Sequence, residues 1–147
     1  MGDADTVDIL VIEDNPFDAE LMLRAFRKQN IINPLLVLED GSAALDFLFS
    51  RGAYADREIS RLPKVIFLDL KLPKLNGLEV LKAIKSEERT RSIPVVIVTS
   101  SREDPDIKTA YALGVNSYVV KPVDSGTFIQ AIGSLGAYWL LVNTPPK

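Results

Sequence analysis

The segment Lys64-Val65-Ile66-Phe67-Leu68-Asp69 decides the fold that this sequence predicts. Its apolar run is typical of a strand buried on both faces, and such strands belong to parallel sheets that are covered by helices. Asp69, a carboxylate, stands directly after the run. Because ligands of open parallel α/β sheets bind at the carboxyl ends of the strands, Asp69 is a candidate functional residue.

Three other apolar runs also end in side chains that can bind a ligand. They are Val7–Ile12 before Glu13-Asp14, Val95–Val98 before Thr99, and Ser117–Val120 before Lys121-Pro122. Carboxylates are preferred ligands of hard divalent cations. A hydroxyl and an amine can stabilise the oxygens of a phosphoryl group. The strand ends therefore predict a site for a divalent cation and a phosphoryl group.

Strand and helix patterns alternate five times along the chain. The predicted strands are 7–12, 35–38, 64–68, 94–98 and 116–120, and the predicted helices are 16–30, 42–49, 78–85, 105–113 and 124–142. Asn15 and Pro16 favour a helix start as N-cap and first residue. The polar stretch 51–62 is interpreted as a loop. This alternation predicts one α/β domain over 1–147, with a core of about 7–142 and a parallel sheet covered on both faces.

The composition excludes several classes of function. A net charge of -3 and a pI near 5.0 argue against nonspecific nucleic-acid binding. The sequence shows no long apolar span for a membrane helix and no secretory leader, so we expect no membrane partner. The absence of cysteine fits a cytoplasmic location.

The absence of histidine also limits the chemistry. It rules out Ser-His-Asp and Cys-His mechanisms and any imidazole metal ligand, so a bound metal would be a hard, oxygen-liganded ion. In a relay from histidine to aspartate, the histidine would have to come from a partner protein.

Taken together, these residues resemble the signature of receiver domains of the two-component response-regulator family. The matching residues are Glu13-Asp14, Asp69, Pro73, Gly77, Thr99, Tyr118 and Lys121-Pro122. The resemblance covers nearly the whole chain. It implies a flavodoxin-like, doubly wound sheet of five parallel strands in the order 2-1-3-4-5, with five helices.

The resemblance implies a role for each acid. Asp69 would be the phosphoacceptor, and Mg²⁺ (or Mn²⁺) would be bound by Asp14, Asp69 and the backbone carbonyl of Lys71, with Glu13 acting through water. A physical reason supports this set. Two like charges about 4 Å apart repel by roughly 4 kcal/mol at an effective dielectric constant near 20, and a divalent cation relieves that repulsion.

The resemblance also implies the residues around the phosphoryl group. Thr99, Ser100 and Lys121 would bind its oxygens, and a cis bond before Pro122 would aim the Lys121 amine. Thr99 and Tyr118 would form a switch that shifts the population between two conformations. The chain would act as a phosphoacceptor that assists its own phosphotransfer and dephosphorylation, rather than as an enzyme.

The end of the last predicted helix is unusually apolar. Tyr138, Trp139 and Leu140 are candidates for an interface, because exposed apolar patches usually mark one. The sequence leaves two interpretations open, a homodimer or partner surface and an intramolecular cap on the edge of the sheet.

A narrower resemblance is to single-domain regulators of phytochrome-type histidine kinases. It is carried by Glu13-Asp14-Asn15-Pro16, the insertion at 51–56 and Tyr138-Trp139-Leu140. It implies a light-regulated sensor histidine kinase as partner, and a homodimer built with the fourth and fifth strand-helix region.

Three alternatives remain at this stage. A pseudo-receiver would serve only as an interaction module, although it would usually lack part of the acid, Thr and Lys set. A phosphatase of the haloacid dehalogenase type would need a second acid where Lys71 stands. A flavodoxin would need a hydroxyl- and glycine-rich loop where this chain has Glu13-Asp14-Asn15-Pro16.

Overall fold

The computed structural model describes residues 6–122 and 124–146. In this part of the chain a five-stranded parallel sheet has the order β2-β1-β3-β4-β5. Its strands are β1 Ile9–Ile12, β2 Leu35–Leu38, β3 Val65–Leu68, β4 Val95–Thr99 and β5 Ser117–Val120. The predicted flavodoxin-like strand order is therefore confirmed.

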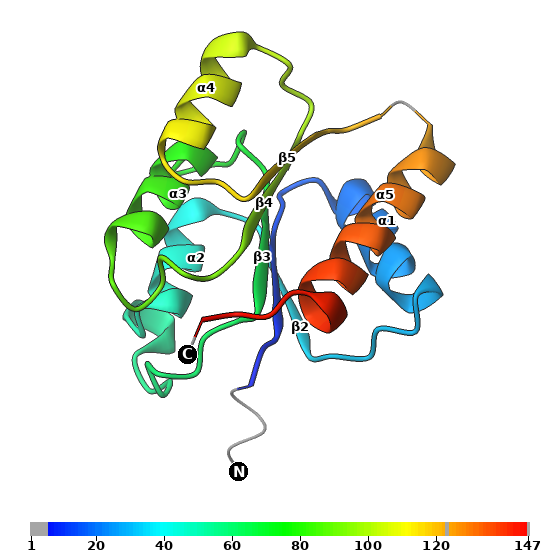
Figure 1. The fold of residues 1–147 in the computed structure, drawn as a ribbon. Helices are drawn as coiled ribbons and strands as arrows, with labels where there is room; N and C mark the ends of the chain where they lie inside the picture. Colours follow the sequence, from blue (N-terminus) through cyan, green and yellow to red (C-terminus); the bar gives the residue numbers. More distant parts are fainter. Residues whose placement is uncertain (1–5, 123, 147) are drawn as a thin grey trace.

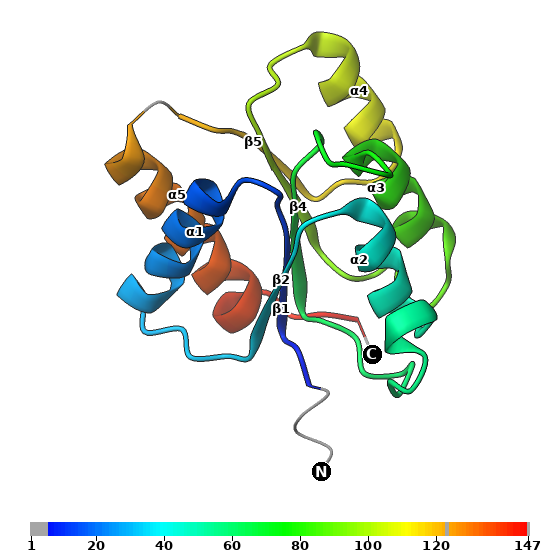
Figure 2. The ribbon, with the colours of Figure 1, turned by 180° about the vertical axis from the view of Figure 1, so that it is seen from behind.

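Five α-helices connect and follow the strands. They are α1 Pro16–Lys28, α2 Gly41–Leu48, α3 Gly77–Ser86, α4 Asp104–Ala112 and α5 Ser125–Ala137. Helices α1 and α5 cover one face of the sheet, and α2, α3 and α4 cover the other (Figures 1 and 2). The predicted helices are present, with ends that shift by one or a few residues.

The core forms two apolar layers, one on each face of the sheet. Successive residues of β1 alternate between them: Leu10 and Ile12 join the layer under α2 and α3, whereas Ile9 and Val11 join the layer under α1 and α5. Residues Ile9–Ile12 and Val65–Leu68 are fully buried. Burial on both faces is why these two strands read as unbroken apolar runs.

Helix α5 packs closely on α1 at two glycines. A Cβ atom added at Gly136 would lie 2.8 Å from Cε1 of Phe26, and one at Gly133 would lie 3.1 Å from the backbone oxygen of Ala25. The absence of side chains at these positions allows the two helices to approach. Packing thus compensates for the low helix propensity of glycine.

The predicted helix 124–142 is divided in the structure. Regular α-helix ends at Ala137, and Tyr138–Val142 (η3) continues as a π-helical turn closed by a 2.8 Å hydrogen bond from the Asn143 N–H to the Tyr138 carbonyl. The predicted loop at 51–62 contains a short 3₁₀ turn, Gly52–Tyr54. The expectation that the chain has no long apolar span is wrong, because by length and composition Ser125–Val142 could cross a bilayer. Burial of Phe128 and Ile132 in the core accounts for part of the apolar character of this segment.

Candidate functional site

The carboxyl ends of four strands bring most of the predicted site residues to one edge of the sheet. Glu13 and Asp14 follow β1, Asp69 follows β3, Thr99 ends β4 and Lys121 follows β5. A cavity of about 600 Å³ opens at this edge. Its lining residues are Glu13, Asp14, Asn15, Pro16, Asp18, Asp69, Lys71, Ser100 and Lys121.

Three carboxylates form a compact acidic cluster in this cavity. Glu13, Asp14 and Asp69 each offer an oxygen atom, and these atoms all lie within 4.8 Å of one another. Glu13 is only 2% exposed and Asp69 is buried, whereas Asp14 is exposed. A dense set of oxygen ligands without sulfur or nitrogen fits a hard divalent cation such as Mg²⁺ or Mn²⁺.

Burial governs the ionisation of Glu13. It raises the pKa of this carboxyl from 4.5 to about 7, helped by the negative charge of Asp69 and opposed by the hydrogen bond from Lys121. The backbone N–H of Asn15 donates to Glu13 Oε2 at 3.1 Å and also favours the charged form.

Lys121 places its ammonium group among carboxylates. Its Nζ atom lies 2.9 Å from Glu13 Oε1, 3.0 Å from Asp69 Oδ2 and 2.8 Å from Asp18 Oδ2. Burial alone would lower the pKa of Lys121, but the hydrogen bonds to Asp18 and Glu13 and the charge of Asp69 outweigh it and raise that pKa. The group is therefore a fixed positive charge beside Asp69.

Asp18 is the residue of this site that the sequence interpretation missed. It lies in the first turn of α1, four residues after Asp14, and its backbone N–H donates to the cap side chain of Asn15 at 3.1 Å. Asp14 precedes the N-cap Asn15 and lies outside the helix, so helical spacing does not relate it to Asp18. An acid in the first turn of a helix is common for its interaction with the helix dipole, so the local sequence carried no signal for this role.

The predicted switch residues are connected through Ser101. The backbone N–H of Ser101 donates to Thr99 Oγ1 at 3.3 Å, and the Tyr118 hydroxyl donates to the Ser101 carbonyl at 3.0 Å. The Ser101 hydroxyl in turn donates to Asp106 Oδ2 of α4 at 2.6 Å. Thr99, Tyr118 and α4 are thus joined by one short hydrogen-bonded path.

One expectation at this site is wrong. Among residues 6–122 and 124–146 no peptide bond is cis, so the bond between Lys121 and Pro122 is trans. Trans is the lower-energy form of an X-Pro bond by about 0.5–1 kcal/mol. The Lys121 amine reaches Asp69 with this trans bond in place.

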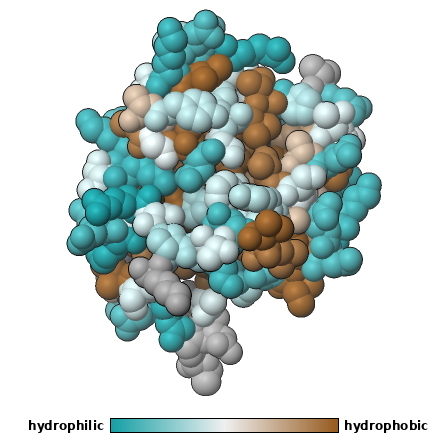
Figure 3. Space-filling view, viewed as in Figure 1, coloured by the Kyte–Doolittle hydropathy of each residue, from teal (hydrophilic) through white to brown (hydrophobic). Residues whose placement is uncertain are grey.

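The interface candidates divide into two groups in the structure. Trp139 and Leu140 pack against the apolar layer under α1 and α5, as an intramolecular cap would. Tyr138 is exposed, and so are its neighbours Leu141 and Val142, at 71% and 65%. Apolar surface gathers over β5 and over this end of the last helix (Figure 3).

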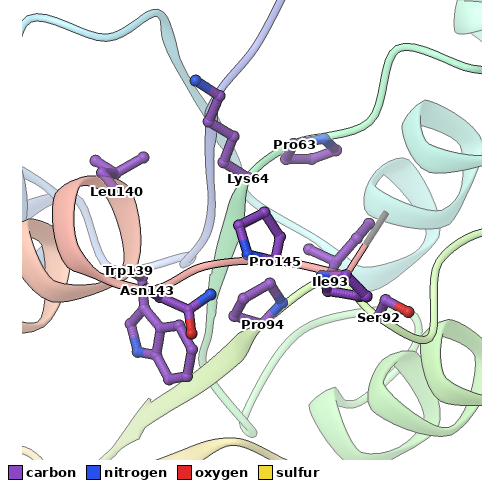
Figure 4. A pocket seen from close by; sticks show the side chains of 10 residues that line it. Pro63, Lys64, Ser92, Ile93, Pro94, Trp139, Leu140, Asn143 and Pro145 are labelled. Atoms are coloured by element: carbon purple, nitrogen blue, oxygen red, sulfur yellow. The ribbon is translucent and has the colours of Figure 1, made fainter.

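A second cavity, of about 310 Å³, lies at the opposite end of the sheet from the acidic cluster. The segment that follows η3 crosses this end of the sheet toward the face covered by α2, α3 and α4, and Pro145 lies near Pro94 and Pro63 (Figures 1 and 4). Trp139 also lines this cavity, and its buried Nε1 atom has no hydrogen-bond partner within residues 6–122 and 124–146. Neither the acids nor Lys121 contribute to it.

Comparisons with known proteins agree with the geometry. Residues 9–133 match the family model described as the response regulator receiver domain. A probable methanogenesis regulatory protein, FilR2 of Methanothrix harundinacea, is 41% identical over 94% of this chain and 86% of its own length. Response regulator Rcp1 of Synechocystis is 36% identical over 94% of this chain and 92% of its own length.

Solved structures are similar as well. The Mn²⁺-bound form of Rcp1 superposes with a TM-score of 0.87 at 34% identity, covering 95% of this chain and 98% of that one. The phosphorylated cyanobacterial phytochrome response regulator RcpA superposes with a TM-score of 0.88 at 33% identity, covering 97% and 99%. The resemblance to receiver domains, and to phytochrome response regulators among them, is therefore confirmed.

Proposed function

The chain belongs to the response regulator receiver domain family, and from that premise we propose that Asp69 accepts a phosphoryl group from a sensor histidine kinase. The observation that carries the proposal is the position of Lys121, whose ammonium group lies 3.0 Å from Asp69 Oδ2 and 2.9 Å from Glu13 Oε1. A buried acid beside a fixed cation is suited to hold the charge of a phosphoryl group.

In the proposed reaction, a carboxylate oxygen of Asp69 attacks the phosphorus atom of a phosphohistidine in the kinase. A new O–P bond forms, the N–P bond breaks, and its electron pair stays on the imidazole nitrogen, which takes up a proton. Lys121, Thr99 and Ser100 donate hydrogen bonds to the phosphoryl oxygens. Water later cleaves the acyl phosphate and restores Asp69, so the protein assists its own dephosphorylation.

The acidic cluster would hold Mg²⁺ or Mn²⁺. Asp14, Asp69 and the backbone carbonyl of Lys71 would bind the ion directly, and Glu13 would act through water. When bound, the ion offsets the repulsion between the carboxylates and the incoming phosphoryl group. The Mn²⁺-bound form of the relative Rcp1 supports this assignment.

Thr99 and Tyr118 would transmit the modification. If Thr99 turns its hydroxyl toward the phosphoryl group, Oγ1 gives up its present contact with the Ser101 N–H, to whose carbonyl Tyr118 is bonded. This loop and α4 would then favour a second arrangement, which changes the surface offered to partners.

The same proposal includes the location, oligomeric state and partner kinase of the protein. It acts as one receiver domain over 1–147 in the cytoplasm, forms a homodimer, and responds to a phytochrome-type kinase. The relative RcpA, a cyanobacterial phytochrome response regulator, supports the kinase assignment. The relative FilR2, named for methanogenesis, makes it necessary to test that assignment with more than one kinase.

Intact-mass analysis tests the central step. The wild-type protein and Asp69→Asn are incubated with acetyl phosphate, with and without Mg²⁺. A single phosphoryl adduct that requires Mg²⁺ and is lost in Asp69→Asn is the expected result. An adduct that survives in Asp69→Asn would overturn the assignment of Asp69, and no adduct with acetyl phosphate or purified histidine kinases would leave an unphosphorylated interaction module.

A further inference from the structure

Lys121 contacts one carboxylate that the proposed reaction does not use. An ammonium group has three N–H donors. Those of Lys121 meet Glu13 at 2.9 Å, Asp69 at 3.0 Å and Asp18 at 2.8 Å. Asp18 is outside the cluster of three carboxylates that could hold a metal ion. Lys121 therefore has one carboxylate partner, Asp18 of α1, that lies outside the predicted metal site.

The other two partners of Lys121, Glu13 and Asp69, also take part in the proposed reaction. Asp69 would become an acyl phosphate, and Asp69 directly and Glu13 through water would bind the metal ion. Their interactions with Lys121 must then weaken or rearrange. Asp18 binds neither the phosphoryl group nor the metal ion, so it can keep its hydrogen bond from Lys121 throughout the reaction.

The fold holds Asp18 in place before any reaction begins. Asn15 caps α1 and accepts the backbone N–H of Asp18, and Pro16 fixes the first helical residue. The buried face of α1 packs against the sheet. The Asp18 carboxylate is partly buried, with 21% of its side chain exposed. A short side chain on a capped helix is a rigid partner.

Lys121 needs such a partner more than most groups of the site. Its backbone is fixed by a 2.7 Å hydrogen bond from its N–H to the Thr99 carbonyl. The four-carbon side chain beyond that point has many rotamers, and fixing them costs conformational entropy. A contact that restricts these rotamers in advance lowers the barrier of any step that needs the ammonium group in one place.

We propose that Asp18 is a positioning residue, which holds the Lys121 ammonium group within reach of Asp69 while Glu13 and Asp69 engage the metal ion and the phosphoryl group. This inference rests on the proposed function. It predicts a specific effect on the rate of phosphorylation, transmitted through Lys121, and no effect on the affinity for metal.

The test measures adduct formation by intact mass over a series of acetyl phosphate concentrations at saturating Mg²⁺. For Asp18→Ala we expect the maximal rate to fall about tenfold, as for loss of one hydrogen bond to a charged group. The donor concentration at half-maximal rate should not change. For Asp18→Asn, whose amide oxygen still accepts a hydrogen bond, we expect a rate within about threefold of wild type.

Two comparisons separate positioning from a general effect on α1. Glu20→Ala removes another acid of the same helix, one that contacts Arg24 and Arg27 on the surface, and should leave the rate unchanged. Mn²⁺ affinity, followed by electron paramagnetic resonance of the free ion, should be the same in the wild type and both Asp18 variants. If Asp18 only stabilised α1, the rate of adduct formation would not distinguish Asp18→Ala from Glu20→Ala.

A double-mutant cycle tests the route through Lys121. In a Lys121→Ala background, Asp18→Ala should slow adduct formation by less than about twofold, because the group it positions is gone. A full tenfold loss in that background would overturn the inference. So would equal acceleration in Asp18→Ala and Asp18→Asn, since it would mean that Asp18 repels the phosphoryl group instead of positioning the lysine.

The remaining outcomes are also decisive. If wild type forms the Asp69 adduct and Asp18→Ala forms it at the same rate, the positioning role is wrong and the proposed function stands. If wild type forms no adduct from acetyl phosphate or from any histidine kinase, the proposed function fails and this inference fails with it. If Asp18→Ala does not fold, the rates of Asp18→Asn and Asp18→Leu decide, with the leucine variant expected to be slow.

Discussion

The hydroxyl of Tyr118 donates a hydrogen bond to the backbone carbonyl of Ser101 at 3.0 Å, which ties β5 to the loop after β4. The same serine binds Thr99 through its N–H and Asp106 through its hydroxyl. The residue proposed to sense the phosphoryl group and the helix proposed to respond therefore share a single intermediary. An aromatic side chain that anchors this loop favours one of its arrangements.

Loss of that hydrogen bond should loosen the loop without affecting the chemistry at Asp69. For Tyr118→Phe we expect the free energy of unfolding to fall by about 1 kcal/mol, as for one hydrogen bond. We also expect faster amide hydrogen exchange in residues 100–106 and an unchanged rate of adduct formation. Tyr111→Phe, at an exposed tyrosine of α4, is the matched control. Equal exchange in both variants would contradict the anchoring role.

Lys85 should stabilise the fold through the hydrogen bonds of its ammonium group. Its ammonium group donates to the carbonyls of Arg91 and Ile93 at 2.9 Å and to Asn116 Oδ1 at 3.1 Å, and burial lowers its pKa. Lys85→Met leaves these acceptors without their donor, so we expect a loss of about 2 kcal/mol in chemical denaturation. Lys82→Met, an exposed lysine of the same helix, should cost little. A similar loss of unfolding free energy in both variants would show that the hydrogen bonds of Lys85 do not stabilise the fold.

Gly136 should tolerate no side chain, because the added Cβ would lie 2.8 Å from Cε1 of Phe26. For Gly136→Ala we expect a destabilisation of about 1–3 kcal/mol from overpacking. At Gly126, near the exposed start of the same helix, the added Cβ would lie 3.3 Å from Oδ2 of Asp124, an exposed side chain that can shift, so alanine should be close to neutral. Thermal unfolding of the pair measures the difference, and the reverse order of stability would refute the close packing of α5 on α1.

The raised pKa of Glu13 predicts opposite effects of pH on stability and on metal binding. The pKa is near 4.5 when the chain is unfolded and about 7 when it is folded, so the stabilising contribution of Glu13 is present below pH 4.5 and is lost as the pH rises through 7. Metal binding requires the charged carboxylate, so Mg²⁺ affinity should rise over the same interval.

Calorimetric titration with Mg²⁺ at pH 6 and pH 8 tests this dependence. The increase in Mg²⁺ affinity from pH 6 to pH 8 that we expect for wild type should be smaller in Glu13→Gln, because glutamine cannot ionise. For the metal-free protein, denaturation in the presence of a chelator should show wild type losing stability relative to Glu13→Gln between the two pH values. A pH dependence of the same size in both proteins would assign the titration to another group.

The proposed homodimer should depend on the exposed part of the apolar helix end. Tyr138 and Leu141 are exposed, whereas Trp139 and Leu140 pack on the core. Replacing Tyr138 and Leu141 by serine should therefore weaken self-association in sedimentation experiments, by at least about tenfold in the dissociation constant, without unfolding the chain. Substitution of the exposed Phe17, at the start of α1 and the opposite end of the sheet from this surface, provides the control. Unchanged sedimentation would place the dimer contact elsewhere.

Much of the architecture could be predicted from the sequence because its causes are local. Buried parallel strands are continuous apolar runs, as in Ile9–Ile12 and Val65–Leu68, and helices begin at recognisable caps such as Asn15-Pro16. Since parallel strands all end at the same edge of a sheet, the residues after them are brought together whatever the details of packing. The sequence therefore predicts that the acids, Thr99 and Lys121 share one site.

Other features depend on distances between parts of the chain that have no local signature. Asp18 meets Lys121 across 103 positions, because α1 and the end of β5 flank the same cavity. The division of the last helix at Ala137, and the burial of Trp139 and Leu140 beside exposed Tyr138, depend on how that helix packs on α1 and the sheet.

The isomer at Pro122 belongs with these features, since the sequence permits both forms. Trans is observed, and with it Lys121 still reaches its three carboxylates. The sequence by itself determined which groups stand at the edge of the sheet, because strand pattern and strand end are encoded residue by residue. Only the tertiary structure decided which of those groups touch, because contact is set by the packing of whole helices and by side-chain reach.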